Sequence, residues 1–314
     1  MTHERHDHDY SCLIPVSPRR TTLIAESRQY EVIVQDIEYV QHDGTPLLTR
    51  LYLPQGSGPF PLVAEVHGGA WCRGDRMDED RLNQALAQRG IVVAALDFRM
   101  PPNAGYPASL TDINYAVRWL KTHATQWHCQ PDAVGLMGLS SGAHQAMLAA
   151  MRPHDPRYAA LHPDPAGQDA RAAFVVLCWP VIDPLGRYHY ALDWKASGRP
   201  YPDAIDRVIP DHLKYWGHEE AMSEASPLRM LERGEPIEMP PVLYLQGEED
   251  LVHPRAHLER FASAYQRAGG DLTLRWFPGE AEGFVNKKPD APATAQAVDE
   301  IARFINTRCQ PKNH

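Results

Sequence analysis

The sequence predicts a doubly wound α/β fold with a mostly parallel sheet. Short apolar runs without polar alternation recur along the chain, at residues 62–66, 91–96, 133–139, 173–178 and 242–245. Runs of this kind are typical of strands that are buried on both faces. Segments with apolar residues three and four positions apart lie between several of them. Alternation of strands and helices indicates parallel strands joined by right-handed crossovers.

The other elements follow in chain order. Residues 31–40 are rich in Val and Ile, and the apolar segment 47–53 follows the turn His42-Asp43-Gly44, so the two segments predict an antiparallel hairpin. Apolar periodicity predicts helices over residues 112–120, 142–151, 255–268 and 297–308.

The chain is expected to form one large domain. Its 314 residues are 43% hydrophobic and 23% charged, which is ordinary for a globular protein. Residues 1–30 are expected to be an N-terminal arm, and residues 31–314 the domain itself. Within it, residues 183–227 are rich in aromatic residues, Pro and Asp, and they break the alternation. We therefore expect a cap-like insertion beyond the carboxyl ends of the strands, where open sheets bind ligands.

Composition narrows the class of partner. The net charge of −9 argues against a nucleic-acid partner, because phosphate binding needs a basic face. The longest apolar stretch, residues 172–182, is too short to cross a bilayer, and the polar N-terminus shows no secretory signal. The five cysteines are widely spaced, which suits reduced thiols. We expect a cytoplasmic protein without membrane contact, with its oligomeric state open, a homo-oligomer included.

A candidate nucleophile lies in Gly138-Leu139-Ser140-Ser141-Gly142, which matches G-x-S-x-G. A predicted buried strand precedes the motif, and a helix rich in small residues follows it. This is the strand–turn–helix setting of a nucleophile elbow, in which the glycines permit a tight turn that exposes the serine hydroxyl. Only Ser140 is in frame.

A candidate oxyanion loop precedes it in the chain. His67-Gly68-Gly69-Ala70-Trp71 directly follows the predicted strand at 62–66. Such a loop can turn backbone N–H groups toward a developing oxyanion, with the N–H of Ser141 as the second donor. His67 is expected to brace the loop. Neither a metal-ligand cluster nor a nucleotide signature is present in the sequence, so we expect no metal and no cofactor.

Over residues 45–306 the chain resembles the α/β-hydrolase superfamily. It is most similar to the HGG-type esterases, namely the hormone-sensitive-lipase-like, kynurenine formamidase-like and feruloyl-esterase-like enzymes. The similarity rests on the two motifs above, on Leu96-Asp97-Phe98-Arg99, on Tyr106-Pro107-Ala108, and on Gln246-Gly247-Glu248-Glu249-Asp250. The resemblance implies an α/β-hydrolase fold, a small-molecule ester as substrate and these roles: Ser140 as nucleophile, Asp250 as acid, and Gly69, Ala70 and Ser141 as oxyanion donors.

The chain departs from this pattern at one position. The stretch that carries the family's histidine reads Pro278-Gly279-Glu280-Ala281-Glu282-Gly283-Phe284 here, with Glu282 in the place of the histidine. A carboxylate, with an ordinary pKa of about 4.3, is a weaker base than an imidazole at about 6.5. Glu282 is a candidate catalytic residue: beside Asp250 it could share one proton, and such a dyad could serve as the base. The alternative bases are His253, three residues after Asp250, and His189, His212 and His218 in the insertion.

Three functions remain open at this point. The first is a serine hydrolase acting on a carboxylic ester or amide of a small organic molecule, with an atypical base. The second is a non-catalytic small-molecule-binding protein on a degenerate esterase fold. The third is a lyase or transferase that uses Ser140, Asp250 and Glu282. The intact elbow, loop and acid favour the first.

The aromatic insertion predicts an apolar pocket, while its basic residues Arg187, Lys195, Arg199 and Arg207 also allow an acidic substrate.

Overall fold

The computed structural model describes residues 29–161 and 167–309. The predicted arm, residues 1–30, lies outside these ranges except for its last two residues. Of these, Tyr30 donates its N–H to the carbonyl of Gln88 at 2.9 Å and sets its ring edge-on against Phe60. The start of the described chain is therefore attached to the body of the domain.

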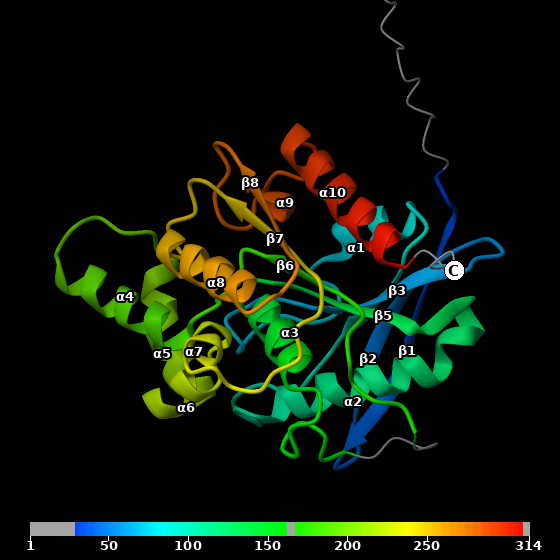
Figure 1. Ribbon diagram of the computed structural model, residues 1–314, viewed down its shortest axis with the longest axis horizontal. Coiled ribbons are helices and arrows are strands. Elements are labelled where there is room, and N and C mark those ends of the chain that lie inside the picture. The colour runs from blue at the N-terminus through cyan, green and yellow to red at the C-terminus, as the bar shows by residue number, and fades with distance from the viewer. Residues whose placement is uncertain (1–28, 162–166, 310–314) are drawn as a thin grey trace, which may run out of the picture.

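The described residues form one eight-stranded sheet in the order β1-β2-β4-β3-β5-β6-β7-β8 (Figure 1). All neighbours from β4 to β8 pair in parallel, whereas β1–β2 and β2–β4 are antiparallel. The predicted mostly parallel sheet is confirmed. The strands are β1 (Val32–His42), β2 (Thr45–Pro54), β3 (Phe60–Val66), β4 (Val92–Leu96), β5 (Cys129–Leu139), β6 (Val175–Cys178), β7 (Val242–Gly247) and β8 (Leu272–Phe277).

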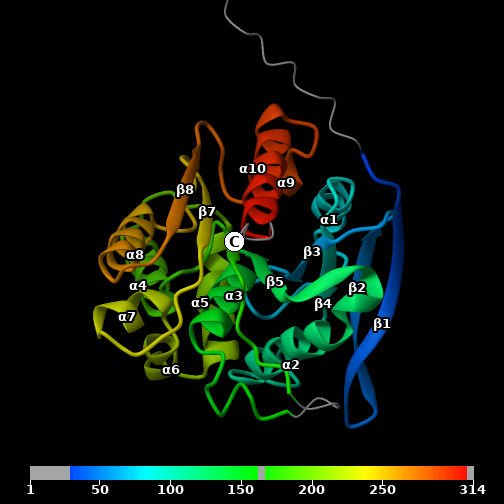
Figure 2. The same cartoon turned by 45° about the vertical axis from the view of Figure 1, so that its right-hand side comes forward.

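Helices cover both faces of the sheet, as Figure 2 shows. On one face α2, α3 and α8 contribute to the same core as Leu62 and Ala64 of β3. On the other, α1, α9 and α10 contribute to a second core, which includes the intervening Val63. Alternate residues of one strand thus enter two different cores, which is why the strand is almost wholly apolar, with the buried Glu65 as its polar residue. The bounds are α1 (Asp80–Ala87), α2 (Ala108–His123), η1 (Ala124–Trp127), α3 (Ser141–Met151), α8 (Arg255–Arg267), α9 (Phe284–Lys287) and α10 (Pro292–Arg308).

The pattern of apolar runs does not predict β8, the strand at one edge of the sheet. Its interior positions are only partly buried, and Arg275 is exposed. An edge strand has one free side and needs no continuous apolar run. The pattern that identifies the central strands is therefore absent here.

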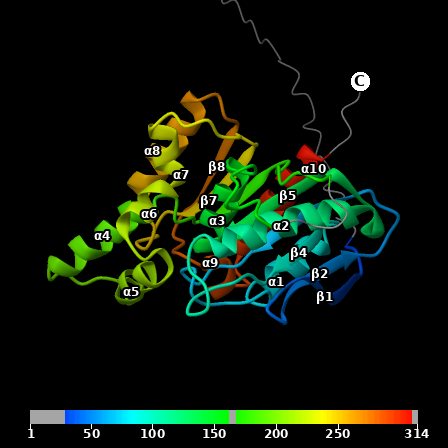
Figure 3. The same ribbon diagram turned by 90° about the horizontal axis from the view of Figure 1, so that it is seen from below.

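Four helices fill the connection between β6 and β7, where the insertion is predicted: α4 (Pro184–Ala196), α5 (Ala204–Trp216), α6 (Glu219–Glu224) and α7 (Pro227–Glu232). They gather beyond one end of the sheet (Figure 3). Tyr215 and Trp216 of α5 are buried against Trp71, with ring centroids 5.6 and 5.4 Å away. These two aromatic side chains of the insertion thus join α5 to the loop after β3. In the described part of the chain, no helix combines the length and apolar character needed to cross a membrane.

A buried ion pair fixes the start of this helical segment. Asp183, fully buried ahead of α4, accepts hydrogen bonds from Arg229 Nε at 2.8 Å and Nη2 at 3.1 Å, and from Ser226 Oγ at 3.0 Å. Burial alone raises the pKa of Asp183, but the hydrogen bonds and charge of Arg229 outweigh it, and the pKa stays below its usual value. The pair joins the first residues of α4 to the first turn of α7.

Removal of this cation is expected to destabilise the fold. Arg229→Met leaves Asp183 buried without its partner, so the free energy of unfolding at pH 7 should fall by about 2–3 kcal/mol in urea titrations. Because the folded-state pKa of Asp183 is depressed, the stabilisation exists above the unfolded pKa and is lost as the pH falls through the folded one. The deficit should therefore shrink below about pH 4. Arg303→Met, in an exposed pair with Glu300, is the control and should change stability by less than about 0.5 kcal/mol. Equal stabilities of the two variants at pH 7 would refute the anchoring role.

Candidate active site

The turn at Ser140 joins β5 to α3 in a strained backbone. Ser140 has φ 53° and ψ −116°, a conformation that non-glycine residues rarely adopt. The flanking glycines are required by space. A Cβ on Gly142 would lie 2.0 Å from the carbonyl oxygen of Val66, and one on Gly138 would lie 2.5 Å from the backbone of Gly142. The predicted strand–turn–helix context of G-x-S-x-G is present, and the turn leaves Ser140 partly exposed at the end of the sheet.

A chain of three side chains runs from Ser140. Its Oγ lies 3.2 Å from Nε2 of His253, and Nδ1 of His253 lies 2.9 Å from Oδ2 of Asp250. Facing a carboxylate, Nδ1 carries the proton, which leaves Nε2 to accept from the serine hydroxyl. His253 and Asp250 are both buried, on the loop between β7 and α8.

The carboxylate of Asp250 is fully occupied by donors. Oδ1 accepts the N–H groups of Val252 at 2.8 Å and His253 at 3.0 Å, and Oδ2 accepts Nε2 of Gln246 at 2.8 Å. Burial alone raises the pKa of Asp250, but the charge and hydrogen bonds of His253, with the N–H of Val252, outweigh it and hold the pKa below its usual value. An ionised carboxylate is thus held against the imidazole.

The structure corrects the expectation for Glu282. Its carboxylate forms an ion pair with Lys287 in the helix α9, and the side chain that reaches Ser140 Oγ is His253. The physical reason is the position of the loop after β7, which brings an imidazole to the serine before the chain reaches β8. The sequence contains a signal for this contact, because His253 lies three residues after the predicted acid, Asp250.

The other candidate histidines lie elsewhere. His189 and His218 are exposed and pair with Glu219 and Glu220. The buried His212 has its Nδ1 2.6 Å from the Val208 carbonyl, and burial holds its pKa well below the usual value. As expected, His67 braces its loop, with Nδ1 2.9 Å from the carbonyl of Gly68.

The loop after β3 lies directly against the elbow. The Trp71 N–H donates to Ser141 Oγ at 3.1 Å, which connects the loop to the first turn of α3. Ala70 and Trp71 both have φ in the left-handed region, at 53° and 61°. Within the described chain, neither the Gly69 N–H nor the Ala70 N–H donates a hydrogen bond. Gly69, Ala70 and Ser140 line the same cavity, so the loop can present free donors next to the serine.

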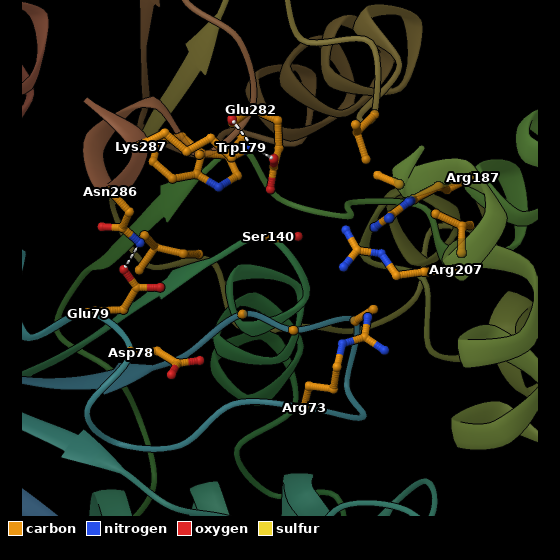
Figure 4. Close-up of a pocket in the computed structure, with 18 residues that line it drawn as sticks. Arg73, Asp78, Glu79, Ser140, Trp179, Arg187, Arg207, Glu282, Asn286 and Lys287 are labelled. Carbon is orange, nitrogen blue, oxygen red and sulfur yellow. Dashed lines mark hydrogen bonds and ion pairs between the residues drawn. The ribbon is translucent and has the colours of Figure 1, made fainter. Parts of the chain in front are cut away.

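That cavity has a volume of about 250 Å³ and is lined by charged side chains on opposite walls (Figure 4). Arg187 and Arg207 enter from α4 and α5. On the other wall, Glu79 hydrogen-bonds Asn286, and Glu282 pairs with Lys287. The remaining charged lining residues are Arg73 and Asp78.

The structure corrects the predicted apolar pocket. From the insertion, the lining residues are Arg187, Ala204, Arg207 and Val208, while the aromatic side chain in the lining is Trp179, which directly follows β6. The described residues contain no group of three or more His, Cys, Asp or Glu side chains arranged to hold a metal ion.

Comparison with known proteins places the fold and site in a family. The model of the BD-FAE family matches residues 50–265, more than half of the chain. The elbow, the glycine loop and the acid all lie within that match. The chain is an α/β-hydrolase, and it belongs to the BD-FAE family.

Curated relatives support the same placement. The esterase LipC of Mycobacterium tuberculosis is 28% identical over 257 residues, which is 79% of this chain and 58% of LipC. A probable isoprenylcysteine alpha-carbonyl methylesterase of Arabidopsis thaliana, ICMEL1, is 39% identical over 97 residues, which is 31% of this chain and 20% of that protein. The chain thus spans less than two thirds of the length of these relatives.

Solved structures share the fold. The esterase LipW of Mycobacterium marinum superposes with a TM-score of 0.72 at 23% identity, covering 89% of this chain and 83% of LipW. An esterase of Pyrobaculum calidifontis gives 0.72 at 23% identity, covering 90% and 87% of the two chains. The sheet with its helices is therefore a known architecture.

Proposed function

We propose that the chain is a serine esterase that hydrolyses carboxylic esters of small molecules, with Ser140 as nucleophile and His253 as general base. The observation that carries the proposal is the hydrogen-bonded chain from Ser140 Oγ through His253 to Asp250. The names of the relatives LipC and ICMEL1, an esterase and a probable methylesterase, support the same reaction class.

The first half-reaction transfers the acyl group to the protein. Ser140 Oγ attacks the ester carbonyl while Nε2 of His253 takes its proton, and Asp250 stabilises the imidazolium that results. The carbonyl oxygen becomes an oxyanion held by the N–H groups of Gly69, Ala70 and Ser141. Collapse of the tetrahedral intermediate breaks the bond to the alcohol, which leaves with the proton from His253.

Water completes the cycle. Nε2 of His253 removes a proton from a water molecule that attacks the acyl-enzyme, and the same oxyanion donors stabilise the second intermediate. Release of the carboxylic acid returns the proton to Ser140. A purely binding protein has no need of a strained serine aligned with a buried His–Asp pair, and strain of this kind is typical of functional sites. The geometry therefore favours catalysis over the binding function.

Covalent labelling gives the direct test. A fluorophosphonate probe reacts with a serine that has both a base and an oxyanion hole. Mass spectrometry should place one adduct on Ser140, and Ser140→Ala should remove it. Circular dichroism confirms that both proteins are folded. A folded wild-type chain that stays unlabelled would contradict the proposal.

Substitution separates the two candidate bases. His253→Ala should lower kcat for a short-chain 4-nitrophenyl ester by about 10³-fold or more, since the serine loses its proton acceptor. Glu282→Gln should lower it by less than about tenfold, because its carboxylate contacts Lys287 and not the serine. His189→Ala, at an exposed histidine, is the matched control and should leave kcat unchanged. The reverse order, with Glu282→Gln the more damaging, would assign the base to Glu282.

The pH dependence distinguishes the same alternatives without a mutation. A base must be deprotonated to accept the serine proton, so the rate of labelling falls as the pH drops through its pKa. An imidazole is ordinarily a stronger base than a carboxylate, so with an imidazole base the rate should fall at a higher pH than with a carboxylate base. A rate that persists undiminished to pH 5 would indicate a carboxylate base.

A further inference from the structure

Two arginines in the cavity have no anionic partner among the residues that the structure describes. Arg187 is only 4% exposed, and its Nε and Nη1 lack any hydrogen-bond partner. Arg207 is exposed, and within residues 29–161 and 167–309 it forms neither an ion pair nor a side-chain hydrogen bond. Both guanidinium groups point into the cavity from the α4–α5 side in Figure 4.

The buried charge of Arg187 lowers the stability of the folded protein. Burial lowers its pKa to about 10, so the group stays protonated at neutral pH. A buried charge is normally paired. The three carboxylates whose charges act on Arg187 belong to Glu282, Asp250 and Asp211. Each is already engaged, with Lys287, with His253, and with Arg73 at 2.7 Å.

We propose that Arg187 and Arg207 bind a carboxylate of the substrate, so that the esterase prefers monoanionic esters. A planar guanidinium suits this group because it can donate two parallel hydrogen bonds to a carboxylate. The inference rests on the proposed function and adds the class of ester to it.

The charge balance of the cavity favours a single negative charge. Lys287 neutralises Glu282, and Asp211 neutralises Arg73. Burial raises the pKa of Glu79 to about 7, so that it is only partly ionised at neutral pH. Two free arginines then face Asp78 and the partly ionised Glu79, which leaves the lining residues with a net charge between 0 and +1. A monoanion matches this balance, whereas a phosphate dianion exceeds it.

The position of the serine fixes the length of the substrate. Ser140 lies between the arginines and the acidic wall in Figure 4. A carboxylate on the arginines and an ester carbonyl over Ser140 must therefore fit together in about 250 Å³. This volume suits a half-ester of a short dicarboxylic acid or an ester of a small hydroxy acid.

The test compares esters that differ by one carboxylate group. One pair places the carboxylate on the acyl side, mono-4-nitrophenyl glutarate against 4-nitrophenyl butyrate. A second places it on the leaving group, 3-carboxy-4-nitrophenyl acetate against 4-nitrophenyl acetate, with each value corrected for spontaneous hydrolysis. In at least one pair kcat/KM should be about tenfold or more higher for the anion at low salt.

Variants assign the preference to the arginines. Arg207→Gln, at an exposed position, should reduce the anion-to-neutral ratio by about tenfold, and Arg187→Lys should reduce it as well, because a lysine cannot form the planar fork. Arg199→Gln, elsewhere in the same segment and outside the cavity, makes the same change in net charge and should keep the ratio. Neutral esters hydrolysed as well as anionic ones in both pairs would falsify the inference while leaving the esterase intact.

A binding measurement keeps the inference testable if no ester is hydrolysed. Calorimetric titration of Ser140→Ala with monomethyl glutarate and with methyl butyrate measures the subsite without catalysis. Tighter binding of the anion, lost on adding Arg207→Gln, supports the carboxylate subsite even if the esterase proposal fails. Equal binding of both ligands overturns it.

Discussion

The contact between the first turn of α3 and the end of β3 is the constraint on which the site depends. No side chain fits at Gly142, because a Cβ there would lie 2.0 Å from the carbonyl oxygen of Val66. This approach places Ser140 directly beside the loop after β3. The hydrogen bond from the Trp71 N–H to Ser141 Oγ then fixes the two segments together. The nucleophile and the candidate oxyanion donors therefore belong to one rigid unit, which is the arrangement that transition-state stabilisation requires.

That rigidity also accounts for where the backbone is strained. Six non-glycine residues of the described chain have a positive φ, and four of them, Ala70, Trp71, Ser140 and Trp179, surround the cavity or the elbow. Strained residues persist only where the surrounding packing determines their conformation. Here the packing includes Trp71, whose ring lies among the aromatic side chains of Tyr215 and Trp216. The α4–α7 segment thus helps to hold the oxyanion loop in place.

The sequence predicted those parts of the site that depend on local geometry. The elbow, the glycine loop and the acid each follow a strand that is buried on both faces, and such strands leave recognisable apolar runs. The sequence left the base open between Glu282 and several histidines, because a family pattern gives a position in the chain, whereas the contact with the serine depends on positions in space. His253 lies 113 residues from Ser140 and reaches it only because the sheet places β7 two strands from β5. Similarly, composition shows that the insertion is rich in aromatic residues, but it does not show which side of the insertion faces the cavity.

Two arginines of the α4–α7 segment have opposite surroundings. The difference distinguishes an arginine that stabilises the fold from one that is proposed to bind the substrate. Arg229 is paired with the buried Asp183 and joins helices, a role that any well-folded insertion needs. Arg187 is more deeply buried, yet it has no carboxylate of its own and shares a wall with the exposed Arg207. An unpaired buried charge lowers stability, so packing alone does not explain it. In the proposed function the loops that follow the strands supply the reacting groups, and the inserted helices supply the charge for the substrate. Because the two sets come from different elements, the charge of the bound ester can change without displacing the serine, the imidazole or the oxyanion donors.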